Sequence, residues 1–114
     1  MGDAHRVAML AKHDAIVAST PDIERTGKTM PNTSANGYMF SLLNKDGELG
    51  IRLPKTSIAD LEKAHMAGET SDFRSHGSVM RDYVRIPPDL MDDPSTLSRY
   101  LSDGLAYVMS LEPK

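Results

Sequence analysis

The chain of 114 residues contains no cysteine and no tryptophan, and only 5% of its residues are aromatic. The absence of cysteine excludes disulfide bonds, thiolate catalysis and every cysteine-based metal site, and it is typical of a reducing cytoplasm. No window reaches the roughly 18 consecutive apolar residues that a membrane-spanning helix needs, and the amino terminus lacks the apolar segment of a signal peptide. We therefore expect a soluble, cytoplasmic protein that makes no contact with membranes.

The sequence also has little net charge, because 13 basic residues nearly balance 16 acidic ones and the net charge is −3. Weak acidity gives no general attraction for nucleic acid, although it is compatible with a local basic group. A chain of this length is typical of one domain, so residues 1–114 are expected to form a single domain. Methionine is abundant, with 8 residues. This predicts either an adaptable core or a methionine-lined binding groove.

Residues 36–54 predict the hairpin around which the fold is arranged. In the second arm, Leu49, Ile51 and Leu53 alternate with polar residues and glycine, as in a strand with one buried face. The first arm, residues 38–43, is apolar on both faces, which favours an inner strand. The segment 45–47 contains Asp and Gly and supplies the turn.

The rest of the chain predicts an α+β fold, in which an N-terminal, a middle and a C-terminal helix pack on a small antiparallel β-sheet. The N-terminal helix is expected to run from Asp3, as its N-cap, to about Ser19, and the middle helix from residue 56 or 57 to about 66. Asp92 or Asp93 caps the C-terminal helix, which has a continuous apolar stripe. Strands are expected within residues 23–30 and over 78–86, and loops over 31–37 and over 68–77, the second anchored by Phe73.

Several segments occur in an order that resembles the TfoX amino-terminal domain. They are Met39-Phe40, Asp46-Gly47, Leu49-Gly-Ile-Arg-Leu-Pro54, Met80-Arg-Asp-Tyr-Val-Arg-Ile-Pro87 and the closing stretch Leu101–Lys114. The resemblance covers roughly residues 28–114, by pattern and not by one diagnostic motif. It implies an α+β fold related to the MmcQ/YjbR-like proteins, a link to regulators of natural competence, and no catalytic residue. A full regulator would continue into a carboxy-terminal helix-hairpin-helix-like domain, so the resemblance implies a stand-alone module of unknown function.

Residues that carry chemistry do not form a catalytic pattern. The four histidines lack the close spacing of zinc ligands, and His5 and His13 are expected on a solvated helix face. Glu48 has no evident partner, and the serines lack a Gly-x-Ser-x-Gly elbow. We therefore expect no enzyme activity, no metal and no cofactor.

Arginine provides the candidate binding residues, which are Arg52, Arg81, Tyr83 and Arg85. If their strands are neighbours, three guanidinium groups and a phenol gather on one face and suit phosphate or a carboxylate-bearing partner. The alternative is that the arginine stems cover the sheet while their charged ends lie in water. Two functions follow: a regulatory or protein-interaction module, which includes self-association, and weak nucleic-acid binding through the arginine patch. The acidic net charge favours the first.

Overall fold

The computed structural model describes residues 2–20, 23, 25–27, 31–44, 47–65, 72–75 and 78–113. Ten of these residues are described by their backbone alone: Gly2, Asp3, Arg25, Thr26, His65, Asp72, Ser75, Ser78, Arg81 and Pro88. The described part contains four helices: α1 (Gly2–Ser19), α2 (Lys55–His65), α3 (Pro88–Met91) and α4 (Pro94–Met109). It also contains six strands: β1 (Arg25–Thr26), β2 (Asn32–Ala35), β3 (Tyr38–Leu43), β4 (Leu49–Arg52), β5 (Asp72–Ser75) and β6 (Ser78–Arg85).

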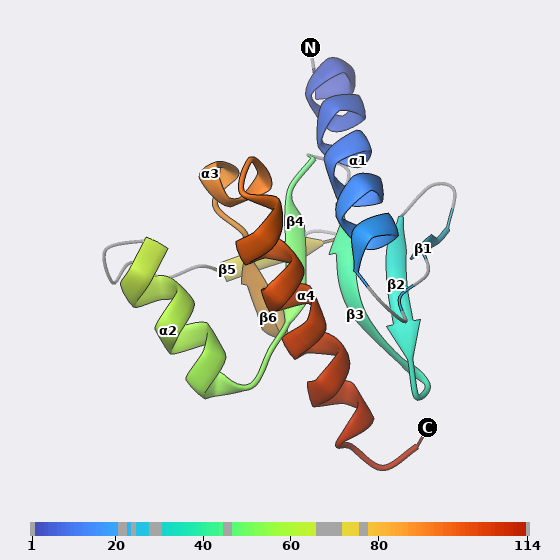
Figure 1. Ribbon diagram of the computed structural model, residues 1–114, viewed down its shortest axis with the longest axis vertical. Coiled ribbons are helices and arrows are strands. Elements are labelled where there is room, and N and C mark those ends of the chain that lie inside the picture. Colours follow the sequence, from blue (N-terminus) through green and yellow to red (C-terminus); the bar gives the residue numbers. More distant parts are fainter. Residues whose placement is uncertain are drawn as a thin grey trace.

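The strands form an antiparallel sheet in the order β1-β2-β3-β4-β6-β5, and the helices pack on it. Figure 1 shows α4 crossing one face of the sheet, with α1 on one side of it and α2 on the other. The predicted α+β class, with helices packed on an antiparallel sheet, is confirmed. No helix in the described ranges is both long and apolar enough to cross a membrane.

The predicted hairpin is β3–β4, in which Ser41 pairs with Ile51 and Leu43 with Leu49. Gly47 has φ +79°, the left-handed conformation that the turn requires and that glycine adopts at little cost. Because β3 also pairs with β2, it is an inner strand, as its two apolar faces predict. Lys45 and Asp46, which were assigned to the turn, lie outside the described residues.

The loop expected over residues 31–37 is wrong, because residues 32–35 form β2. Asn36 and Gly37 have φ 57° and 83° and connect Ala35 to its partner Tyr38. Two left-handed residues in succession make the tight turn that matches the twist of a hairpin, and Asn-Gly is its preferred sequence. The Asn36 Nδ2 also donates to the carbonyl oxygens of Val108 and Leu111, at 2.8 and 2.9 Å, and so attaches this turn to the end of α4.

The loop expected over residues 68–77 is also wrong in part, because residues 72–75 form the edge strand β5. Phe73 is fully buried, as expected of its anchor. A Cβ atom on Gly50 would lie 2.4 to 2.5 Å from ring atoms of Phe73, so glycine is needed there for the ring to lie on β4. The sequence did not predict this strand, because a short segment with one aromatic residue among polar ones shows no alternation of apolar and polar residues.

The remaining elements follow the expected order with shifted ends. α1 begins at Gly2, so Asp3 is inside the helix and does not cap it. The Asp93 carboxylate caps α4 and accepts a hydrogen bond from the Thr96 N–H at 3.3 Å. Of the strand expected within residues 23–30, the structure describes Arg25–Thr26 as β1.

The core lies between α4 and the sheet. A Cβ atom on Gly104 would lie 3.0 Å from the Arg52 carbonyl oxygen and 3.1 Å from Ile51, so α4 approaches β4 closely. The apolar stripe of α4 faces this core through Leu97, Leu101 and Val108, each at most 1% exposed.

Candidate functional site

The predicted arginine residues lie on neighbouring strands. In the register of β4 with β6, Arg52 pairs with Tyr83 and Gly50 pairs with Arg85. Cross-strand partners share a face, as do residues two apart in a strand, so the register places Arg52, Tyr83 and Arg85 on one face. Only the backbone of Arg81 is described, and its side chain lies outside this account.

The guanidinium group of Arg52 is surrounded by protein groups. Its Nη2 lies 3.9 Å from the Asp82 Oδ2, and its Cζ lies 5.3 Å from the ring centre of Tyr38 and 5.7 Å from that of Tyr107. These cation–π contacts and the carboxylate both stabilise the positive charge. Asp82 has φ +67°, an uncommon conformation for a residue other than glycine, and it interrupts the regular alternation of β6.

The phenol of Tyr83 is a structural group in this arrangement. Its hydroxyl donates to the Met39 carbonyl oxygen at 2.7 Å, and its ring lies 6.0 Å from that of Phe73. Burial raises the pKa of Tyr83 to about 12, against a smaller lowering by the charge of Arg52. Tyr83 therefore stays neutral and connects β6 to β3 across β4.

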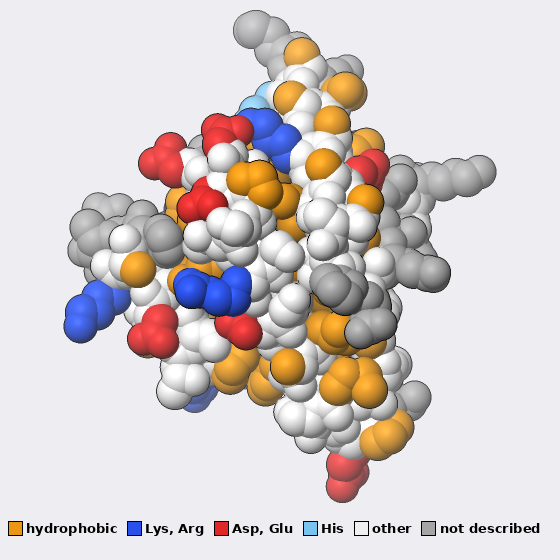
Figure 2. Space-filling model, viewed as in Figure 1, with side chains coloured by type: hydrophobic (Ala, Val, Ile, Leu, Met, Phe, Trp, Pro, Cys, Tyr) orange, Lys and Arg blue, Asp and Glu red, His pale blue; other side chains and the backbone are white. Residues whose placement is uncertain are grey.

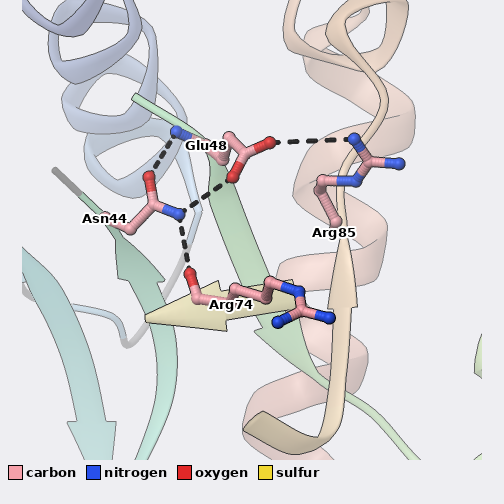
Figure 3. Close-up of polar contacts among 4 residues, drawn as sticks. All are labelled: Asn44, Glu48, Arg74 and Arg85. Carbon is pink, nitrogen blue, oxygen red and sulfur yellow. Dashed lines mark hydrogen bonds and ion pairs between the residues drawn. The ribbon is translucent and has the colours of Figure 1, made fainter. Parts of the chain in front are cut away.

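Arg85 belongs to a polar network that sequence reasoning missed (Figure 3). Its Nη1 lies 3.7 Å from the Glu48 Oε2, and the Glu48 Oε1 accepts a hydrogen bond from the Asn44 Nδ2 at 3.0 Å. Asn44 is 2% exposed and also donates to the Arg74 carbonyl oxygen at 2.8 Å, while its Oδ1 accepts from the Glu48 N–H at 2.8 Å. The buried amide thus fixes the Glu48 carboxylate beside Arg85.

The Glu48–Arg85 pair lies in the wall of a cavity of about 340 Å³. The cavity is formed where the amino-terminal half of α1, the β3–β4 turn, the end of β6 and α3 meet. Its lining residues are His5, Met9, Gly47, Glu48, Leu49, Arg85, Ile86 and Met91. The imidazole of His5 packs on Gly47, where a Cβ atom would lie 2.7 Å from its Cδ2. This volume is at the lower end of the range for small-molecule sites, about 300 to 1,000 Å³.

Among the four histidines, the structure describes the side chains of His5 and His13. His13 is fully buried and its Nε2 lies 3.2 Å from the Ser41 Oγ, so the expected solvated position is wrong for this residue. His5 is exposed at the cavity, as expected. Among the described residues, no group of three or more His, Cys, Asp or Glu side chains could hold a metal ion.

A second surface of note is the exposed side of α1. Alanine and valine residues repeat along it at steps of three and four, and Val7 is 66% exposed. We call this set the outer face of α1: Ala4, Val7, Ala8, Ala11, Ala15 and Ala18. Figure 2 shows hydrophobic side chains spaced along this part of the molecule. Arg6 lies on the other side of the helix, where its Nε donates to the Asn44 carbonyl oxygen at 3.2 Å, and Lys12 bonds to Asp92.

Comparison of the chain with models of known protein families, and with curated proteins, gives no match. The resemblance to the TfoX amino-terminal domain therefore stays a prediction.

Proposed function

We propose that the protein is a non-enzymatic interaction module of the TfoX amino-terminal type, located in the cytoplasm, that associates with a second copy of itself through the outer face of α1. The observation that carries the proposal is the composition of that face. Solvent-exposed sides of surface helices are normally polar or charged, whereas here six apolar residues cover about 21 Å of helix from Ala4 to Ala18.

A second copy of the chain is the partner that this face fits best. Ala4, Ala8, Ala11, Ala15 and Ala18 follow alternating steps of four and three, the spacing with which two helices pack along a common seam. Alanine side chains allow two helix backbones to approach closely, and a face without charge matches itself without a complementary ion. The resemblance to a regulator domain and the lack of cysteine support the regulatory class and the reducing compartment.

Sedimentation equilibrium at protein concentrations up to about 1 mM tests this proposal, since it detects association as weak as roughly −4 kcal/mol. We expect a monomer–dimer equilibrium that Ala11→Glu abolishes, because the new carboxylates would face each other in the seam. The matched control is Ala59→Glu, an exposed alanine of α2 with Lys63 four residues later. A monomeric protein throughout the range, or unchanged association in Ala11→Glu, would refute the proposal.

Nucleic-acid binding through the arginine residues is the second candidate, and two contacts weigh against it. Arg52 lies near Asp82 and Arg85 near Glu48, so a phosphate would have to compete with a carboxylate at each described guanidinium. An NMR titration with a short DNA duplex tests it. Amide shifts at Arg52, Tyr83 and Arg85 that disappear as salt is raised would favour this candidate over self-association.

A further inference from the structure

The cavity beside Glu48 and Arg85 combines two opposite charges with an apolar wall. The apolar part comes from four side chains on three elements and the segment after β6: Met9, Leu49, Ile86 and Met91. Leu49, Ile86 and Met91 are at most 5% exposed, so this wall is firmly part of the core. Methionine adapts its shape to a bound apolar group, which corresponds to the methionine-lined groove that the composition allowed.

The two charged groups keep capacity for a further partner. The Glu48 and Arg85 side chains are 36% and 42% exposed, and the 3.7 Å between Oε2 and Nη1 is longer than a hydrogen bond. The Arg85 Nε is buried and has no hydrogen-bond acceptor among the described residues. A guanidinium group has five N–H donors, four of them on the two Nη atoms, and the Nη donors are those that the exposed end of Arg85 offers to a ligand.

Neither a simple anion nor a simple cation matches this pair. Asn44 holds the Glu48 carboxylate in place, where it repels an anion bound to Arg85. Arg85 in turn repels a cation bound to Glu48. A ligand whose carboxylate and ammonium groups are attached to the same carbon atom is attracted by both side chains, with its carboxylate on the guanidinium and its ammonium on the Glu48 carboxylate.

We propose that the cavity is a binding site for a free α-amino acid with an apolar side chain. The α-carboxylate binds Arg85, the α-ammonium binds Glu48, and the side chain packs against Met9, Met91 and Ile86. The cavity of about 340 Å³ is of the size expected for a ligand this small. The site lies on the side of α1 opposite its outer face, so this proposal does not depend on self-association.

L-Leucine and two analogues that each lack one charge test the proposal. 4-Methylpentanoate has the same carbon skeleton without the ammonium, and isopentylamine has it without the carboxylate. In NMR titrations to about 10 mM ligand, we expect leucine to shift the amides of Gly47, Leu49 and Ile86, and each analogue to bind at least about tenfold more weakly. No shift with leucine, or equal binding of an analogue, would overturn the proposal.

Two variants give opposite patterns that a non-specific effect would not produce. Glu48→Gln should weaken leucine binding and strengthen 4-methylpentanoate binding, because it removes the repulsion of the anion. Arg85→Gln should weaken the binding of leucine and of 4-methylpentanoate, and it should strengthen isopentylamine binding because it removes the repulsion of the cation. The matched controls Glu112→Gln and Arg99→Gln, at exposed positions outside the cavity lining, should change nothing. The folding of each variant is checked by thermal unfolding. If Arg85→Gln does not fold, Glu48→Gln tests the proposal by itself, because its amide oxygen still accepts a hydrogen bond from Asn44. The proposal is wrong if Glu48→Gln affects leucine and 4-methylpentanoate equally.

Discussion

Asn44 is the residue whose substitution most directly tests the polar network beneath the cavity. Its side-chain amide makes three hydrogen bonds within the described part of the chain, two with Glu48 and one with the Arg74 carbonyl oxygen, at 2.8 to 3.0 Å. Asn44→Ala removes all three. The N–H of Glu48 and the carbonyl oxygen of Arg74 then lose these partners, while the backbone bond from the Asn44 N–H to the Glu48 carbonyl oxygen stays possible.

The cost follows from the groups that are left behind. Each buried backbone group that loses its partner costs about 1–3 kcal/mol. For the two groups together we expect a loss of about 2–4 kcal/mol in the free energy of unfolding. This is the lower part of the summed range, because Arg74 is exposed and water can replace part of the hydrogen bond to its carbonyl oxygen. The expected loss is a large fraction of the stability of a small domain.

Urea denaturation followed by circular dichroism measures this loss, with Ser34→Ala as the control. Ser34 is exposed in β2, where its Oγ donates a 3.3 Å hydrogen bond to the Asn32 Oδ1, so its substitution should cost less than about 1 kcal/mol. A loss for Asn44→Ala that is no larger than that of Ser34→Ala would refute the role given to the Asn44 network.

Two further predictions concern the core and the tyrosine that connects three strands. Leu101→Ala should cost about 2–5 kcal/mol, because Leu101 is 1% exposed between α4 and the sheet, and the half-buried Leu105→Ala should cost clearly less in the same urea assay. Burial raises the pKa of Tyr83 from its ordinary 10.0 to about 12 in the folded protein. The neutral hydroxyl therefore stabilises the fold fully below pH 10, and this contribution is lost as the pH rises through 12. Tyr83→Phe should therefore lose less stability than the parent protein between pH 10 and 12, and an identical alkaline loss in both would contradict the assignment.

The elements that could be predicted are those with a strong local signal. The hairpin β3–β4 has clear alternation and a glycine in its turn, and α4 has a capping aspartate followed by a regular apolar stripe. These signals are properties of neighbouring residues, so they can be detected in the sequence without knowledge of the tertiary fold.

The elements that were missed depend on contacts between residues that are not neighbours in the sequence. β2 contains polar residues, and it is held by pairing with β3 and by the buried contact between Thr33 and Ser41. The Asn36-Gly37 pair was the available signal for its turn. β5 is defined by the packing of Phe73 on Gly50, and the whole of α2 lies between these two residues in the sequence. His13 was placed in solvent because the helical pattern does not reveal that Ser41 lies opposite it.

The same reasoning explains why the sequence places Arg52, Tyr83 and Arg85 on one face and does not reveal the acidic groups beside them. Alternation alone places Arg52 on one face of β4 and Tyr83 with Arg85 on one face of β6. The pairing of Gly50 with Arg85 then brings Glu48 beside the same guanidinium, and this register cannot be read from either strand by itself. Likewise, the left-handed φ of Asp82 belongs to an irregular strand that carries its carboxylate to Arg52. Of the guanidinium groups expected to form a basic surface, those of Arg52 and Arg85 therefore each lie near a carboxylate. This arrangement is the basis of the proposal that the cavity prefers a ligand with both charges over a phosphate.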